Sequence, residues 1–300
     1  MVLNGRLGLI RDMLPVCAKL CDVGTDHARI PASALLDGLC RNAIATDIRP
    51  GPLERASRTL RHFGLDTRME LRLGAGLDPI FPGECDVLVI AGMGALMIID
   101  ILESGADVAR QASCILLQPM HAQERLRPWL RRNGYAILSE RLASEGEKRY
   151  QVLAVRYDPA GTEKSPLFAE TTRPPGWRPV PEKALPGLPS NPASPVYDRL
   201  GFSIANAPDP LAVPWVLDWM KRQRRIVAGL RMSGREPGDL AAAAGLLEQM
   251  EGCLQVLQSG RGGVSLSEGT AGLSNLGRTA LRMDDAAVPS CKPEKGGCGR

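Results

Sequence analysis

Two polar side chains that could take part in a reaction, Asp26 and His27, follow directly after a glycine-containing turn. The turn ends the apolar segment of residues 17–22, and its Gly24 lets the backbone pass close beneath a ligand. Such a pair indicates chemistry as well as binding, because carboxylates stabilise positive charge and accept protons. Two structural alternatives stay open. Asp26 could be the N-cap of a helix starting at His27, and His27 could simply bond to backbone there.

A second carboxylate, Asp47, ends the next short apolar segment, residues 43–46. It lies about 20 residues beyond the glycine turn, where α/β folds bind the hydroxyls of a ribose. The turn itself is no complete G-x-G-x-x-G motif, because Asp26 and His27 stand where further glycines would be. The pattern alone therefore suits NAD enzymes, S-adenosylmethionine enzymes and inactive relatives alike.

Two further glycine-containing segments narrow these alternatives. Gly74-Ala75-Gly76 follows an expected third strand, where adenosylmethionine enzymes commonly place a loop against the adenine ring. Residues 86–94 form an expected fourth strand that ends in Ala91, Gly92, Met93 and Gly94. Small residues there allow substrate or cofactor to approach the backbone closely. Tight packing of a helix on a strand is the competing explanation.

Short apolar segments alternate with helical patterns over the first half of the chain. This alternation predicts an α/β fold: a seven-stranded, mostly parallel, Rossmann-like sheet with helices on both faces. The strands are expected near residues 17–22, 42–47, 69–73, 85–91, 113–118, 135–142 and 149–157. The helices are expected near residues 27–38, 51–63, 93–104 and 122–133, after an amphipathic opening helix that Pro15 ends.

The sequence predicts four regions: the α/β domain at 1–158, a linker at 159–197, a helical hairpin at 198–258 and a tail at 259–300. The linker is rich in proline, which disfavours helices and central strands. Apolar residues then recur in steps of three and four along two segments, which is typical of an antiparallel helical hairpin with a coiled-coil-like core. The glycine-rich tail has few large apolar residues and is expected to be disordered.

The composition is that of an ordinary globular protein, with 44% hydrophobic and 23% charged residues. No apolar segment reaches the roughly 20 residues that span a bilayer, and residues 1–6 carry no secretion signal. We therefore expect a cytoplasmic protein that does not bind membranes. The eight cysteines are scattered, as in reduced proteins, and Cys291 and Cys298 lack partners for a metal site, so no metal is expected.

Positive charge is concentrated in one part of the chain, although the net charge is only +4. Residues 221–235 contain no acidic residue. They contain six cations: Lys221, Arg222, Arg224, Arg225, Arg231 and Arg235. A nucleic-acid contact and an ordinary solvated helix face explain this basic run equally well.

Several segments, in order along residues 3–157, resemble the bacterial tRNA (adenine-22, N1) methyltransferases. The most specific are Asp22-Val23-Gly24-Thr25-Asp26-His27 and Ile90-Ala91-Gly92-Met93-Gly94. The others are Ala43-Ile44-Ala45-Thr46-Asp47, Leu116-Leu117-Gln118-Pro119, Leu126-Arg127-Pro128-Trp129-Leu130, Asn133-Gly134-Tyr135 and Lys148-Arg149-Tyr150. In that family an adenosylmethionine-binding domain is followed by a helical coiled-coil domain.

The resemblance implies methylation of N1 of a tRNA adenine with S-adenosyl-L-methionine as cofactor. Asp26 and His27 are then the catalytic candidates, with Asp26 stabilising the positive charge that develops on the purine. The cofactor-binding candidates are Asp22, Gly24, Thr25, Asp47, Ile48, Gly74, Ala75, Gly76, Ala91 and Gly92. The candidates for binding tRNA are Met93 and Gly94 at the base, and Lys221, Arg222, Arg224 and Arg225 on the hairpin.

The chain departs from the family's pattern at three positions. Ala75 stands in place of an acid, Ala95 in place of a glycine and Arg29 in place of an aromatic residue. Two alternatives therefore stay open: a methyltransferase acting on a small molecule, and a non-catalytic RNA-binding module with a degenerate cofactor pocket. The basic hairpin speaks against the first alternative, and Ala75 slightly favours the second.

Overall fold

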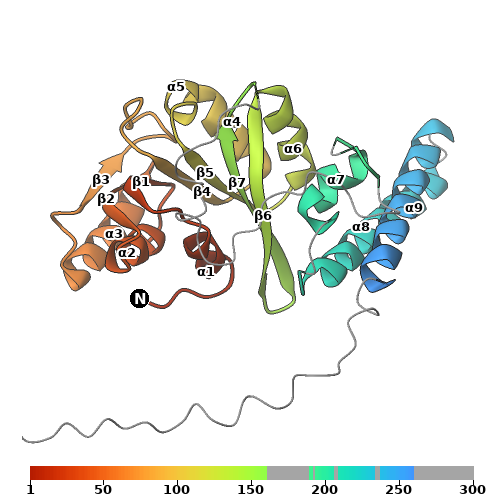
Figure 1. Cartoon of the computed structure of the whole chain (residues 1–300), viewed down its shortest axis with the longest axis horizontal. Coiled ribbons are helices and arrows are strands. Elements are labelled where there is room, and N and C mark those ends of the chain that lie inside the picture. Colours follow the sequence, from red (N-terminus) through yellow and green to blue (C-terminus); the bar gives the residue numbers. More distant parts are fainter. Residues whose placement is uncertain (161–188, 192, 206–208, 234–236, 260–300) are drawn as a thin grey trace, which may run out of the picture. The chain divides into compact units, whose positions relative to one another are not determined.

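The fold was analysed in a computed structural model, which describes residues 1–160, 189–191, 193–205, 209–233 and 237–259. Its centre is a seven-stranded sheet with the strand order β3-β2-β1-β4-β5-β7-β6 (Figure 1). The strands are β1 (Cys17–Val23), β2 (Cys40–Asp47), β3 (Met69–Leu73), β4 (Val87–Met93), β5 (Cys114–Pro119), β6 (Tyr135–Glu145) and β7 (Lys148–Tyr157). The expected fold class is therefore confirmed.

Strands β1 to β5 are parallel, whereas β7 runs antiparallel to both β5 and β6. The chain builds the sheet outward from β1 in one direction through β2 and β3, and then returns to place β4 on the other side of β1. Such a switch point opens a crevice at the carboxyl ends of the two central strands. Asp22 and Gly24 lie at this edge of the sheet, as the sequence predicts.

Helices cover both faces of the sheet, and the central strands are buried between two hydrophobic clusters. Val87 and Val89 of β4 face one cluster, and Leu88 and Ile90 face the other. This explains why β4 is a continuous apolar run rather than an alternating one. The first cluster includes residues of α1 (Gly5–Asp12), α2 (Arg29–Leu36) and α3 (Pro50–Phe63). The second includes residues of α4 (Ala95–Ser104), α5 (Ala106–Ala109) and α6 (Gln123–Arg132).

Two α-helices in the described part of the chain were not predicted. One is the single turn α5, and the other is α7 (Pro195–Leu200), which occupies the last residues of the expected linker and the first of the expected hairpin region. Pro195 is the first residue of α7, where proline is favoured because its missing N–H has no helical partner. The prediction that the proline-rich linker contains no helix is therefore wrong at residues 195–197. Residues 161–188 of the expected linker lie outside the described residues.

The expected helical hairpin consists of α8 (Ala212–Ser233) and α9 (Pro237–Ser259), after a short 3₁₀ turn, Phe202–Ala205. The two helices contact each other along an apolar core, and the Gln223 side chain donates to the Ala243 carbonyl oxygen at 2.9 Å. On α9 the steps of three and four residues predict Leu247 and Leu254 in the apolar core, but the buried residues lie one position earlier. Leu246 and Cys253 are buried, whereas Leu247 and Leu254 pack at the margin.

A buried ion pair joins the sheet to α7. Arg127 of α6 is 2% exposed and Glu140 of β6 is 1% exposed, and Arg127 Nε lies 2.7 Å from Glu140 Oε1. The same guanidinium donates to the Asp198 carbonyl oxygen of α7 at 2.9 Å. Because a buried charge without a partner is costly, this pair ties the three elements together.

The described residues fall within one compact unit, Met1–Arg261. The boundary predicted near residue 158 stays a prediction, and the expected tail beyond Ser259 lies outside the described residues. No helix in the described part of the chain is long and apolar enough to cross a membrane. The described ranges also contain no group of three or more His, Cys, Asp or Glu side chains arranged to hold a metal ion.

Candidate active site

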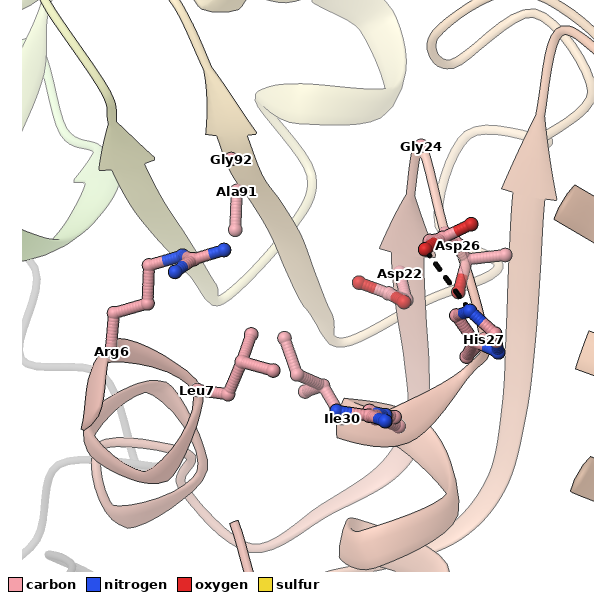
Figure 2. A pocket seen from close by; sticks show the side chains of 11 residues that line it. Arg6, Leu7, Asp22, Gly24, Asp26, His27, Ile30, Ala91 and Gly92 are labelled. Carbon is pink, nitrogen blue, oxygen red and sulfur yellow. Dashed lines mark ion pairs between the residues drawn. The ribbon is translucent and has the colours of Figure 1, made fainter. Parts of the chain in front are cut away.

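Two cavities open at the carboxyl ends of the central strands, and they share Gly24, Ala91 and Gly92. The first, which we call the Asp26 cavity, has a volume of about 440 Å³ (Figure 2). Its other lining residues are Arg6, Leu7, Asp22, Thr25, Asp26, His27, Arg29 and Ile30. The second, the Asp47 cavity, has a volume of about 560 Å³. Its other lining residues are Val23, Asp47, Ile48, Arg49, Gly74, Ala75, Gly76, Met93, Met97 and Ile101.

The loop after β1 is held against the end of β2. The backbone N–H groups of Gly24 and Thr25 both donate to the Thr46 carbonyl oxygen, at 2.9 and 2.8 Å. Gly24 has a φ of +75°, which favours glycine, and a Cβ there would collide with Cε of Met93. The backbone conformation therefore requires glycine here, whereas the Met93 side chain, whose flexible end makes the contact, could move aside.

Asp26 does not cap a helix. Helix α2 begins at Arg29, its N-cap residue is Ala28, and the Ala28 N–H donates to the Thr25 hydroxyl at 3.1 Å. The capping alternative, together with the expected helix start at His27, is therefore wrong. Ala28 has a φ of 51°, so the chain makes one more turn before the helix. Asp26 is thus free to point away from α2.

The Asp26 carboxylate instead accepts hydrogen bonds from Arg55 of α3. Both Nε, at 2.9 Å, and Nη2 of Arg55 donate to Oδ1 of Asp26, and Nε2 of His27 lies 3.3 Å from the other oxygen (Figure 2). The Arg55 guanidinium lowers the pKa of Asp26 below its usual value, and the nearby His27 adds to this. Asp26 is therefore an ionised acceptor at neutral pH, and its side chain is 65% exposed at the cavity.

Asp22 forms the buried floor of the same cavity. Burial raises its pKa to about 6, and the hydrogen bond with Thr25 opposes this only in part. No cationic side chain in the described ranges forms an ion pair with Asp22. A buried carboxylate of this kind fits a positively charged group of a ligand.

Asp47 lies at the carboxyl end of β2 in the second cavity, as expected. It is buried, and its Oδ1 accepts the Arg49 N–H at 2.8 Å. The loop Gly74-Ala75-Gly76 lines the same cavity, where Ala75 presents a methyl group. The structure thus brings together the two segments that the sequence assigned to a ribose and an adenine ring.

Neither Met93 nor Gly94 lines the Asp26 cavity, where a wall that supports the base is expected. A β-bulge between Ala91 and Met93 turns Met93 into the Asp47 cavity. Gly94 lines neither cavity, and a Cβ on it would collide with the His121 ring. The predicted role of these two residues in holding the base stays a prediction; of this segment, Ala91 and Gly92 line the Asp26 cavity.

Sequence reasoning missed Arg6, which extends from α1 toward the carboxyl end of β4 (Figure 2). The Arg6 guanidinium pairs with Glu145 of β6 at 2.5 Å and lies over the Tyr150 ring, 5.3 Å from its centroid. The opening helix gave no sign of a cavity contact. The only available signal was the Lys148-Arg149-Tyr150 segment, which is part of the family resemblance and contains the aromatic ring under Arg6.

The basic run on α8 lies outside both cavities. Lys221, Arg222, Arg224 and Arg225 are exposed. Residues 221–235 contain no acidic residue, but in the structure Arg224 pairs with Glu251 of α9 at 3.1 Å. Arg222 lies over the Trp219 ring, 5.0 Å from its centroid.

An α/β sheet with its cavities at the switch point defines a Rossmann-like, nucleotide-binding class of protein. Within that class the chain belongs to the methyltransferase domain family, whose model matches residues 3–153. It is 37% identical over 151 residues to the tRNA (adenine(22)-N(1))-methyltransferase of Bacillus subtilis. That match covers 50% of this chain and 63% of the length of the relative. The resemblance noted in the sequence is thereby confirmed.

Solved structures give the same result for the fold. The Bacillus subtilis m1A22 tRNA methyltransferase is 25% identical, with a TM-score of 0.66 and coverage of 84% of this chain and 99% of that one. A Streptococcus pneumoniae protein described as a putative tRNA (m1A22) methyltransferase, solved in complex with S-adenosyl-L-methionine, is 24% identical. It has a TM-score of 0.62 and covers 83% of this chain and 98% of its own.

Proposed function

We propose that this protein methylates N1 of the adenine at position 22 of tRNA, with S-adenosyl-L-methionine as the methyl donor. The observation that carries the proposal is the pair of adjoining cavities. The Asp47 cavity has a carboxylate suited to a ribose, and the Asp26 cavity has an exposed carboxylate suited to a cationic purine. Gly24, Ala91 and Gly92 line both cavities. The similarity to the Bacillus subtilis enzyme supports the choice of substrate. The reaction takes place where tRNA is found, in the cytoplasm.

The residues present fit adenosylmethionine. Asp47 would accept hydrogen bonds from the ribose hydroxyls, and Gly74, Ala75 and Gly76 would line the space for the adenine. The amino-acid end of the cofactor carries one positive and one negative charge. Asp22 and Arg6, which line the adjoining Asp26 cavity, offer the two opposite charges, Asp22 for the ammonium group and Arg6 for the carboxylate. When bound, the cofactor supplies a methyl group on a positively charged sulfur.

Asp26 is the residue that the reaction needs most. Adenine N1 already has a lone pair, so no base has to remove a proton before the attack. The positive charge passes to the purine, and the Asp26 carboxylate stabilises it or accepts a proton from the exocyclic amine. The Arg55 guanidinium lowers the pKa of Asp26 further below neutrality. Because N1 is covered in a paired helix, the adenine must leave the stack to reach Asp26.

Two assays test the proposal. Calorimetry should detect binding of adenosylmethionine, and incubation with tritiated cofactor should label a tRNA transcript. Binding without any transfer would favour a non-catalytic RNA-binding module. Transfer to small molecules but not to tRNA would favour the other alternative, a small-molecule methyltransferase.

The affinity for adenosylmethionine should fall as the pH is lowered from 7 to 5. Protonated Asp22 cannot pair with an ammonium group, and burial places its pKa at about 6. At pH 5 roughly one-tenth of Asp22 is ionised, so the dissociation constant should rise roughly tenfold. Calorimetry at several pH values measures this. In an Asp22→Asn variant the affinity should be weaker and nearly independent of pH; a wild-type pH profile in that variant would remove Asp22 from the ammonium site.

Neutralising the exposed cations Lys221 and Arg225 with Gln should weaken tRNA binding and lower its salt dependence. Contacts of cations with phosphates release counterions, so the loss of two contacts should reduce the slope of log K against log salt by roughly 1–2 units. Arg224 is left unchanged because it pairs with Glu251. Filter binding at several salt concentrations measures the slope.

The matched control for this experiment replaces Arg41 and Arg132, which are also exposed and line neither cavity, with Gln. Adenosylmethionine affinity should be unchanged in both double variants. If both lower the tRNA slope equally, the basic run on α8 is an ordinary solvated helix face.

A further inference from the structure

A third cavity of about 380 Å³ lies along α3, beside the Asp26 cavity. We call it the α3 cavity. Its lining residues are His27, Arg55, Arg58, Thr59, His62 and Phe63. It shares His27 with the Asp26 cavity, and Arg55 on its wall is hydrogen-bonded to Asp26. The α3 cavity is therefore next to the candidate reaction site, and neither the sequence motifs nor the proposed roles of residues account for it.

The basic residues that line this cavity lie on one face of α3. Arg55, Arg58 and His62 are spaced by three and four residues, which brings side chains to the same side of a helix. No acidic side chain in the described ranges forms an ion pair with Arg58 or His62. Glu54, one turn before Arg58, could have neutralised it but does not pair with it.

The helix itself explains only part of this arrangement. A cation in the last turn is stabilised by the helix C-terminus, which accounts for Arg61. Arg55 and Arg58 lie further toward the middle of the helix. Asp26 offsets the charge of Arg55, whereas no acidic side chain in the described ranges pairs with Arg58, so an anion bound in the cavity would supply its missing partner. Arginine pairs well with phosphate because its planar guanidinium donates two parallel hydrogen bonds.

We infer that the α3 cavity binds a backbone phosphate of the RNA next to the target adenosine, with Arg58 as the main contact. This inference rests on the proposed function. A base that enters the Asp26 cavity brings its flanking phosphates with it, and the only side chain shared by the two cavities is His27. Arg55 already donates to Asp26, so Arg58 carries the free donors. The phosphate thus fixes the position of the base relative to Asp26.

The first test compares Arg58→Gln with Arg61→Gln in the full-length protein. Both changes remove one positive charge from the same helix, but Arg61 does not line the cavity. Arg58→Gln should raise the dissociation constant for a tRNA transcript roughly tenfold and reduce its salt slope by roughly 0.7–0.9. Arg61→Gln should change affinity less than about twofold. Adenosylmethionine affinity should stay at the wild-type value in both.

The second test locates the phosphate. Transcripts are assembled with a single neutral methylphosphonate on one side of the target adenosine or the other. One of the two should weaken wild-type binding by the same factor as Arg58→Gln, and should have no further effect on the Arg58→Gln variant. Additive effects, or equal behaviour of Arg58→Gln and Arg61→Gln, would overturn the inference while leaving the proposed function intact. A wild-type protein that neither binds nor methylates tRNA would overturn both.

Discussion

An Asp26→Asn variant should transfer methyl groups to tRNA at least about 100-fold more slowly than the wild type, a loss of ~2.7 kcal/mol of transition-state stabilisation. Asparagine has nearly the same shape but carries no negative charge, so it cannot offset the charge that develops on the purine. Because α2 begins at Arg29 with Ala28 as its N-cap residue, the exchange leaves the helix start intact. Single-turnover kinetics with saturating cofactor measures the transfer step.

The matched control for Asp26 is Asp66→Asn, an exposed carboxylate that lines none of the three cavities. That variant should be as active as the wild type. Both variants should unfold at the wild-type temperature and bind adenosylmethionine with nearly unchanged affinity. Undiminished transfer by Asp26→Asn would show that Asp26 only positions Arg55 or His27, and the catalytic role would have to be abandoned.

Replacing Asp47 with Ala should weaken adenosylmethionine binding at least tenfold. Each hydrogen bond from a ribose hydroxyl to a carboxylate contributes about 1.5–3 kcal/mol, and a factor of ten corresponds to about 1.4 kcal/mol. Calorimetry measures the affinity directly.

The Asp47 side chain also accepts the Arg49 N–H, so part of the loss could come from a disturbed loop. Asp47→Asn separates the two effects, because its amide oxygen can still accept that hydrogen bond but lacks the charge. Asn should therefore restore only part of the affinity. If the affinity of Asp47→Ala equals that of the wild type, the ribose lies elsewhere.

The sequence was sufficient to predict the sheet and the polar residues at its carboxyl edge. Asp22 and Asp47 end apolar segments, and in a parallel sheet the ends of successive strands meet at one edge. Gly24 was predictable as well, because a tight turn with a positive φ favours glycine. These features depend on local patterns only.

The rest of the site depends on how distant segments pack. Arg55 lies 29 residues from its partner Asp26. The periodicity of α3 predicts a helix, but it does not fix which way that helix turns toward the loop after β1. Arg6 enters the Asp26 cavity because α1 packs near β6 and β7. Arg6 and its partner Glu145 are 139 residues apart in the sequence. No pattern within either segment records these contacts.

The most direct test of the central claim is to map the methylated nucleotide. A tRNA transcript is incubated with the protein and adenosylmethionine, digested with ribonuclease and examined by mass spectrometry. We predict 1-methyladenosine at position 22 and no labelling of a transcript with guanosine at that position. A methyl group at another nucleotide, or none on tRNA from a protein that binds the cofactor, would contradict the account.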